Sequence, residues 1–439
     1  MGTGRSHHHC SSQSLRHHSP LRSQSCCAAA LALALCLGGE LPTATAAPAA
    51  EPAAVAEYAS PDPFTPYGRQ HILMSEELAR YQSLAEGDHW QPLPAGQALA
   101  PGVRDPRVLQ LRSLMMQYGD LPFTESVSGR GALGDGSPRS ADEYDTELQA
   151  AVRRFQRRHG LRQDALVDER TRAQLNVPPA ERVRTLAANL ERLRQLPREL
   201  GPRYILVNIP DFSLKLMEDG REQYRMRVVV GKPKHATPQI ATRMTRVIFN
   251  PVWRVPPSIA LRELLPKGSA ALRARGFRLV SHSGRSVPFT SGNIAGIRRG
   301  KVSLHQKGGP KNALGRVKFE IPNRDAIFLH DTNSKHLFQR PERAFSHGCI
   351  RLEKPLEFAR MMLLEQNGWQ PQRAEQYLNS ARTRAVTLKQ PLPVYIAYWT
   401  AWVDEDGQLQ FRPDIYQRDG QTNERAGEAR QAPEQQQPG

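Results

Sequence analysis

The stretch "AIFLHDTNSKHLFQRPERAFSHGCIRLEKP", residues 326–355, joins an apolar strand that ends in a histidine to a cysteine in a glycine turn. His330 closes the strand, and after fifteen intervening residues the chain reads Ser-His-Gly-Cys at 346–349. A thiol is mostly protonated at neutral pH and needs a base to attack a carbonyl, and histidine titrates in the right range. Gly348 permits a tight turn with open backbone N–H groups. The stretch predicts a nucleophilic Cys349 with His330 as its base.

Cysteine occurs at positions 10, 26, 27, 36 and 349, so loss of the N-terminal segment would leave one thiol. A lone cysteine cannot form an internal disulfide, and it serves as a small buried hydrophobe, a metal ligand or a nucleophile. A zinc site could be drawn from four side chains: His330, His336, His347 and Cys349. Structural zinc normally uses two or more closely spaced cysteines, so we expect no metal and no cofactor. His305 and His336 are expected to be solvent or packing histidines.

Residues 1–46 have the pattern of a cleavable export signal. Arginines precede the apolar run 26–39, and Ala44-Thr45-Ala46 offers a small-residue cleavage site. Fourteen residues is short for a bilayer span, so an uncleaved anchor that would keep the protein at the membrane is the lesser alternative. We therefore expect a periplasmic protein in an oxidising compartment, where a single free cysteine favours a chemical role.

The formal net charge of +17 and the pI near 10.0 raise the question of a polyanionic partner. Nucleic acid is disfavoured because no zinc-finger spacing, homeodomain-like helix or aromatic RNA-binding pattern accompanies the charge. Much of the excess is arginine along helices such as "AVRRFQRRHGLR", which favours a solvated basic face. An anionic cell-wall polymer or membrane surface would suit that face.

The chain is long enough for two or three units, and its patterns indicate a multidomain α+β protein. Runs of strands are joined at Asp219-Gly220 and Asp406-Gly407, which are strong hairpin signals in an antiparallel-rich domain. Residues 258–315 are Gly/Arg-rich and weakly periodic, as in a long functional loop. The expected segments are a signal (1–46), an Ala/Pro linker (47–65), a helical scaffold (66–123), a helical module (124–177), a scaffold helix (178–202), a β-rich catalytic domain (203–420) with a lid (about 258–315), and a disordered tail (421–439).

The helical module is carried by "DEYDTELQAAVRRFQRRHGLRQDALVDERTRAQLN", residues 142–176. Apolar residues recur at helical spacing, and Asp168 is a plausible cap of a second helix. The stretch resembles the small three-helix peptidoglycan-binding module. Ala165 departs from that family, which usually carries glycine at this position, and this puts the geometry of the turn in doubt. A spacer without a ligand is the alternative.

The His330 and Ser-His-Gly-Cys pattern resembles the catalytic motif of the L,D-transpeptidases, and stretches from about residue 75 to 420 resemble the large proteobacterial members. The resemblance implies that His330 is the general base and that Cys349 is acylated. Asp331, Thr332 or a nearby carbonyl could orient the imidazole. The motif neighbours implied to line or support the oxyanion region and the site are Ser346, His347, Gly348 and Arg351.

The resemblance also implies the reaction. Cys349 would expel D-Ala from a tetrapeptide stem of peptidoglycan, and an acceptor amine would resolve the thioester into a 3→3 crosslink. Stem peptides and glycan would be the partners, and carbapenem-type β-lactams the inhibitors. The alternatives are an L,D-carboxypeptidase or endopeptidase that hydrolyses the same acyl-enzyme, and a wall-binding protein without activity. Basic lid residues such as Arg298, Arg299 or Lys301 could hold the acceptor.

Overall fold

The computed structural model describes residues 66–122, 140–197, 199–380 and 382–420, which all belong to one compact unit, Ala59–Gly439. The predicted signal, linker and tail, and the predicted Gly/Ser loop over residues 124–139, lie outside the described residues. None of the helices in the described ranges is both long and apolar enough to cross a bilayer.

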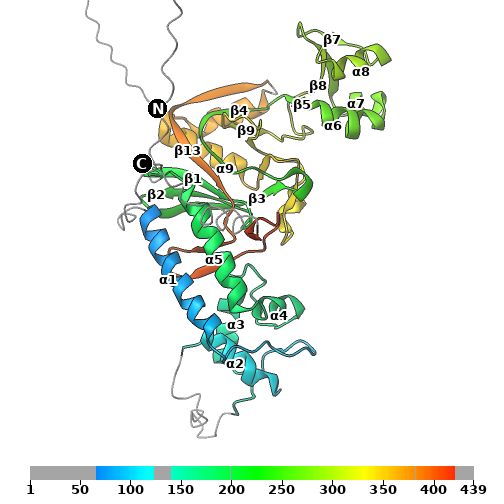
Figure 1. The fold of residues 1–439 in the computed structure, drawn as a ribbon. Helices are drawn as coiled ribbons and strands as arrows, with labels where there is room; N and C mark the ends of the chain where they lie inside the picture. Colours follow the sequence, from blue (N-terminus) through cyan, green and yellow to red (C-terminus); the bar gives the residue numbers. More distant parts are fainter. Residues whose placement is uncertain (1–65, 123–139, 198, 381, 421–439) are drawn as a thin grey trace, which may run out of the picture. The chain divides into compact units, whose positions relative to one another are not determined.

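The helices fall into three groups along the chain, as Figure 1 shows. The first group precedes the sheet, the second lies within the expected lid, and the third follows the cysteine motif. Their bounds are α1 (Pro66–Glu86), α2 (Arg107–Gln117), α3 (Thr146–Arg158), α4 (Glu169–Leu175), α5 (Pro179–Arg194), α6 (Pro257–Ile259), α7 (Ser269–Ala274), α8 (Ser291–Arg298), α9 (Pro355–Asn367) and α10 (Pro371–Asn379).

The strands form one large sheet, one small sheet and one hairpin. The large mixed sheet has nine strands in the order β11-β3-β12-β10-β9-β4-β13-β1-β2, the small one has the order β5-β8-β6-β7, and β14 pairs with β15. Their bounds are β1 (Arg203–Asn208), β2 (Ser213–Glu218), β3 (Arg221–Gly231), β4 (Ile240–Phe249), β5 (Trp253–Val255), β6 (Phe277–Ser281), β7 (Ser286–Val287), β8 (Val302–Gln306), β9 (Val317–Glu320), β10 (Leu329–His330), β11 (Ala344–Ser346), β12 (Ile350–Leu352), β13 (Arg384–Ala397), β14 (Ala401–Val403) and β15 (Leu409–Phe411).

Both predicted hairpins form. The turn between β2 and β3 places Asp219 and Gly220 at φ angles of 49° and 77°, the left-handed conformation that a two-residue hairpin needs. The turn between β14 and β15 contains Gly407 at φ 74°. The large sheet is antiparallel in most of its pairings, as expected, with parallel pairs of β1 with β13, β10 with β12 and β11 with β3.

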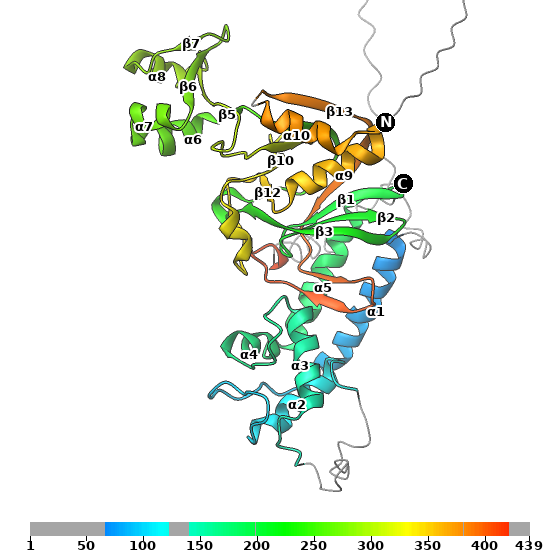
Figure 2. The ribbon, with the colours of Figure 1, turned by 180° about the vertical axis from the view of Figure 1, so that it is seen from behind.

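Two layers of other elements cover the faces of the large sheet. Side chains of β1 alternate between them: Ile205 and Val207 join the core under α9 and α10, whereas Tyr204 and Leu206 join a cluster with the end of α5 and with β13. Figure 2 shows α9 and α10 together on one side of the sheet, away from α1 and α5. The sheet that carries the motif is therefore buried on both faces.

The helical part and the β14–β15 hairpin share a single core. The predicted helical face of α3 is buried, with Leu148 and Val152 at 0% exposure and Phe155 at 1%, and these side chains cluster with Val403 and Phe411 of the hairpin. The predicted cap is present, because the Asp168 carboxylate accepts the Thr171 N–H at 2.8 Å.

The turn before α4 has the left-handed geometry that the sequence left in doubt. Ala165 has a φ of 61° and is fully buried. Its N–H donates to the Gln156 side chain at 2.9 Å, and its carbonyl accepts the Tyr144 hydroxyl at 2.6 Å. Alanine in this conformation costs about 1–2 kcal/mol relative to glycine, and these two buried hydrogen bonds stabilise the turn.

The segment expected to be a long loop is instead a folded lobe, here called the lid lobe (residues 253–311). It contains α6, α7, α8 and the four-stranded sheet. Its buried side chains form a cluster of their own, which includes Leu272, Leu279 and Leu304. The expectation of a loop was wrong because strands of two to five residues between glycines produce little periodicity in the sequence.

We expect the buried pair of Arg158 with Asp120 to be essential to the helical core. Both side chains are at most 3% exposed, and Arg158 also donates to the Leu409 carbonyl of β15 at 3.0 Å. Asp120→Ala strands a buried cation and should lower the free energy of unfolding by about 3–5 kcal/mol, measured by urea denaturation of far-UV circular dichroism. Arg104→Ala, which breaks an exposed pair with Glu143, is the control and should cost less than about 1 kcal/mol. Equal shifts for the two variants would contradict the prediction.

Candidate active site

The pairing of two short strands brings the base and the cysteine together. β10 pairs in parallel with β12, with Leu329 opposite Ile350 and His330 opposite Arg351. The Ile350 N–H donates to the Phe328 carbonyl at 3.1 Å, which extends the ladder beside Cys349. Cys349 immediately precedes β12, and strand alternation would place it on the same face of the sheet as His330, which pairs with Arg351.

His330 is buried, and its orientation follows from a backbone carbonyl. Its Nδ1 lies 2.5 Å from the Asp331 carbonyl oxygen, as the sequence analysis allowed. A carbonyl only accepts, so a proton on Nδ1 satisfies this contact, and the Leu314 backbone is a second hydrogen-bond partner of the ring. Burial lowers the pKa of His330 to about 3, and the positive charge of Arg351 adds to this shift. The imidazole is therefore neutral over the whole physiological pH range.

The thiol of Cys349 is also neutral at rest. Burial raises the pKa of Cys349 above its ordinary value. The backbone of Phe328 and the cations Lys318 and Arg351 oppose that shift without cancelling it. The resting site thus holds a thiol and an imidazole rather than a thiolate and an imidazolium.

A row of side chains surrounds the pair, and it includes a residue that the sequence analysis missed. Lys318 of β9 lies opposite His330, on the other side from Arg351. Its ammonium stands 4.2 Å from the ring centroid of Phe328, and burial lowers the pKa of Lys318. No sequence signal separates this lysine from the other cations in its neighbourhood, because only the register of β9 on β10 places it in the site.

The Ser-His-Gly-Cys turn is held by hydrogen bonds from distant segments. The Thr237 hydroxyl donates to the Gly348 carbonyl at 2.7 Å and accepts the Gly231 N–H at 2.9 Å. The Tyr416 hydroxyl donates to the Gly231 carbonyl at 2.5 Å and accepts the Thr237 N–H at 3.2 Å. Gly348 has a φ of 109°, which only glycine adopts readily. The sequence analysis did not identify Thr237 or Tyr416.

Ser346 is a structural partner of the turn. It is 2% exposed, its hydroxyl donates to the Cys349 carbonyl at 2.5 Å, and the Gly348 N–H donates to that hydroxyl at 3.1 Å. An acyl oxygen that used the Gly348 N–H would therefore compete with the Ser346 hydroxyl. The structure brings Gly348 beside the cysteine, and its assignment to an oxyanion region stays a prediction.

His347 connects the turn to the lid lobe. Its Nε2 lies 2.7 Å from the Glu263 carboxylate, and its ring centroid lies 5.0 Å from that of His235. Glu263 belongs to the lobe, so the lobe reaches the residue two positions before Cys349. The sequence analysis did not identify this contact, which joins residues far apart in the chain.

The remaining histidines of the motif region lie apart from this arrangement. His336 is in a short 3-10 helix, Lys335–Gln339, and His305 is in β8 of the lid lobe. Among the described residues, no group of three or more His, Cys, Asp or Glu side chains is placed to hold one metal ion.

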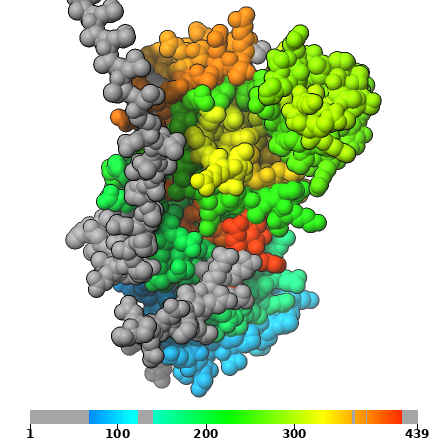
Figure 3. All heavy atoms as spheres, turned by 45° about the horizontal axis from the view of Figure 1, so that its top comes forward, coloured from blue at the N-terminus to red at the C-terminus, as the bar shows by residue number. Residues whose placement is uncertain are grey.

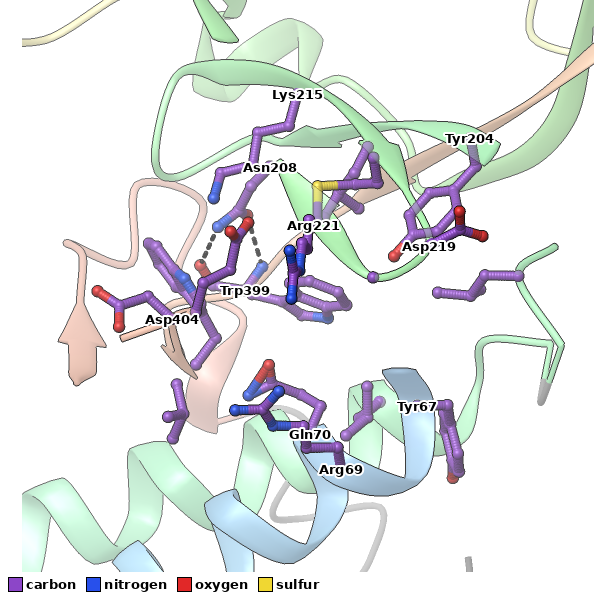
Figure 4. Close-up of a pocket in the computed structure, with 18 of the residues that line it drawn as sticks. Tyr67, Arg69, Gln70, Tyr204, Asn208, Lys215, Asp219, Arg221, Trp399 and Asp404 are labelled. Carbon is purple, nitrogen blue, oxygen red and sulfur yellow. Dashed lines mark hydrogen bonds between the residues drawn. The ribbon is translucent and has the colours of Figure 1, made fainter. Parts of the chain in front are cut away.

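A cavity of about 760 Å³ lies away from the catalytic motif, and none of the motif residues lines it. Figure 4 shows it between α1, which contributes Tyr67 and Gln70, and the β2–β3 turn, which contributes Arg221. Asn208 and Trp399 are joined there by two backbone–side-chain hydrogen bonds of 3.1 and 3.0 Å.

Comparison with protein families agrees with this site. The family model described as the L,D-transpeptidase catalytic domain matches residues 202–391, which include His330 and Cys349. The strand pairing described above therefore lies in a segment that is similar to L,D-transpeptidase catalytic domains. A second model, described as "Putative peptidoglycan binding domain", matches residues 104–175. That match covers α2, α3 and α4, so it includes one helix that the sequence analysis assigned to the scaffold.

Individual relatives carry the same description. A Haemophilus influenzae protein named "Putative L,D-transpeptidase" is 34% identical over 241 residues, which are 54% of this chain and 48% of the relative. The chain thus matches about half the length of this curated relative. L,D-transpeptidase 3 from Mycobacterium tuberculosis, solved with a faropenem-derived adduct, is 12% identical over 45% of this chain and 60% of its own, with a TM-score of 0.22. The L,D-transpeptidase from Stackebrandtia nassauensis is 13% identical over 70% and 97%, with a TM-score of 0.24.

The neutral resting pair predicts the pH dependence of thiol reactivity. Because the pKa of Cys349 is raised, its alkylation by iodoacetamide should accelerate about tenfold per pH unit from pH 7 to 9, without a plateau. The rate is followed by mass spectrometry of the Cys349 peptide. The control is the same peptide in guanidinium chloride, whose rate should level off at lower pH. A plateau below pH 7 in the folded protein would indicate a thiolate–imidazolium pair and contradict the prediction.

Proposed function

We propose that the protein is an L,D-transpeptidase that forms 3→3 peptidoglycan crosslinks through an acyl-enzyme on Cys349. The observation that carries the proposal is the β10–β12 pairing, which sets the buried, neutral imidazole of His330 beside Cys349 in a matched catalytic domain. The relative's name and the second family match support the same substrate polymer.

In the first half-reaction, the Cys349 sulfur attacks the carbonyl of the bond between the L-centre of the third residue, meso-diaminopimelate, and D-Ala. His330 Nε2 takes the thiol proton as the sulfur–carbon bond forms, and it delivers this proton to the departing D-Ala nitrogen. A thiol that deprotonates only during attack needs stabilisation of the charge that develops on sulfur. Lys318 and Arg351, which favour the charged form of Cys349, supply it.

In the second half-reaction, the side-chain amine of an acceptor stem attacks the thioester carbonyl. Neutral His330 accepts a proton from the amine, a new amide bond forms, and the proton returns to the Cys349 sulfur. Water in place of the amine would release a tripeptide, which is the L,D-carboxypeptidase alternative. The two outcomes share the acyl-enzyme and differ only in the nucleophile that reaches it.

Arg351 is the proposed partner of a substrate carboxylate. Its Nε is buried and has no hydrogen-bond partner among the described residues. Buried polar groups are normally paired, so an open donor beside the nucleophile suggests a ligand that completes it. A carboxylate of the stem peptide would match the charge and the planar geometry of a guanidinium.

Export to the periplasm and binding of glycan by the helical module also belong to the proposal. The export signal is a sequence pattern in residues 1–46, and the module is supported by the family match over residues 104–175. The module and the β14–β15 hairpin share one core, so deletion of the module would also remove side chains that pack against the hairpin. Glycan binding is therefore better tested by substitutions on the surface of the module.

The proposal is tested by incubating the purified protein with disaccharide-tetrapeptide and identifying the products by mass spectrometry. We expect a dimer lighter than two monomers by one D-Ala. Cys349→Ala should abolish it, and His330→Ala should slow it by about 10²–10⁴-fold, since it removes the general base. His336→Ala, outside the site, is the control. Accumulation of tripeptide monomer alone would replace the transpeptidase with the carboxypeptidase.

Inhibition offers an independent test of the nucleophile. A strained β-lactam ring is an acylating agent, so a carbapenem should add once to the protein and increase its mass by the intact inhibitor. Peptide mapping should place the adduct on Cys349, and Cys349→Ala should remain unmodified. An adduct on a serine, or none in the wild-type protein, would exclude the assigned nucleophile.

A further inference from the structure

The lid lobe has one covered and one open sheet face. Val255, Leu279 and Leu304 point to the helices of the lobe and belong to its buried cluster. On the opposite face, Arg254 of β5 and Arg278 of β6 each lie directly opposite His305 of β8. The result is a row of three basic side chains across three neighbouring strands, here called the Arg-His-Arg row.

The row places two cations on one face of the small sheet. Arg254 and Arg278 lie on either side of the His305 strand, each opposite His305. Strands lie about 4.8 Å apart, so the two arginine backbones stand only about 10 Å from each other. Both arginines are exposed, whereas His305 is partly buried and bonded to the Ser303 hydroxyl at 2.9 Å. Burial lowers the pKa of His305, and the two arginines add to this shift.

The rest of the lobe has the same charge. Residues 253–311 contain twelve Lys and Arg and one carboxylate, Glu263, a formal charge of +11 out of +17 for the whole chain. All twelve cations are exposed, and none pairs with a carboxylate among the described residues. The excess charge that the sequence analysis ascribed to arginine-rich helices is therefore concentrated in this lobe, which projects in Figure 3 at the upper right.

We propose that the open face of the lid lobe, centred on the Arg-His-Arg row, binds the carboxylates of peptidoglycan stem peptides outside the catalytic site. This inference rests on the proposed function for the identity of the polymer. Two exposed guanidinium groups on one sheet face, about 10 Å apart at the backbone, match carboxylates spaced along a peptide. Glu263 of the same lobe contacts His347 of the motif, so the lobe that carries the row is also in contact with the turn before Cys349.

The row is tested with the full chain carrying Cys349→Ala, so that bound polymer is not consumed. The double variant Arg254→Gln/Arg278→Gln should bind purified sacculi about five- to tenfold more weakly in sedimentation, with a flatter dependence on salt. The matched control is Arg243→Gln/Arg384→Gln, two exposed strand arginines of the large sheet, which should bind like the parent. Sacculi whose carboxylates have been amidated should lose the difference between variant and parent.

Four results would overturn the inference. The first three concern binding: equal sedimentation of the row variant and its parent, an equal loss in the control variant, or a loss confined to vesicles of anionic phospholipid. Carbapenem acylation is measured on Arg254→Gln/Arg278→Gln in a chain that keeps Cys349, and it should proceed at the wild-type rate. A slower rate would make the row part of the catalytic site and would also overturn the inference. Failure of the proposed function is separate. Wild-type protein that processes no disaccharide-tetrapeptide while its sedimentation depends on the row would refute the reaction and retain the binding face.

Discussion

The parallel pairing of β10 with β12 is the constraint on which the site depends. β10 has only two residues, and the second is His330. Its register on β12 sets the imidazole beside Arg351 and one step from Cys349, and its register on β9 adds Lys318. A two-residue strand holds this position because it lies inside a nine-stranded sheet that is covered on both faces. The chemistry thus depends on backbone hydrogen bonds more than on contacts among the catalytic side chains.

Burial of this site has an electrostatic consequence. A buried thiolate–imidazolium pair would have to offset the desolvation of two charges, whereas a thiol and an imidazole avoid that cost. Lys318 and Arg351 favour the charged sulfur without stabilising it enough to ionise at rest. The thiolate is also the form that oxidises, so a raised pKa protects a lone cysteine in the oxidising compartment proposed for this protein. A neutral resting pair fits the proposed reaction, in which charge develops on the sulfur only during attack.

Local signals and motif spacing account for what the sequence predicted. Asp219-Gly220 and Asp168 have conformational preferences of their own, and the hairpin and the cap form as expected. The spacing from His330 to Cys349 marks the loop that returns one strand beside another. The same motif lies within the segment that the L,D-transpeptidase family model matches.

Pairings between distant segments could not be predicted in this way. Thr237, Tyr416 and Glu263 reach the turn from positions that no local pattern connects with it. Ala165 shows a second limit of local signals. Alanine in place of the usual glycine put the geometry of the turn in doubt, but tertiary hydrogen bonds hold the left-handed conformation with alanine in place. The lid lobe was missed because its strands are too short to show a period.

The connection of the lid lobe to the catalytic domain is polar. The buried cluster of the lobe is separate from the core of the large sheet, so the apolar side chains of the lobe stabilise the lobe itself. Asn312, 1% exposed, joins the two connecting segments by donating to the carbonyls of Pro251 at 3.1 Å and Lys307 at 2.9 Å. The pair of Glu263 with His347 is 46% and 29% exposed, and exposed pairs contribute at most about 1 kcal/mol. The exposed pair therefore adds little to the connection, which the buried amide of Asn312 holds through hydrogen bonds. A polymer bound on the basic face of the lobe would thus be tied to the segment that carries Cys349 through these polar contacts.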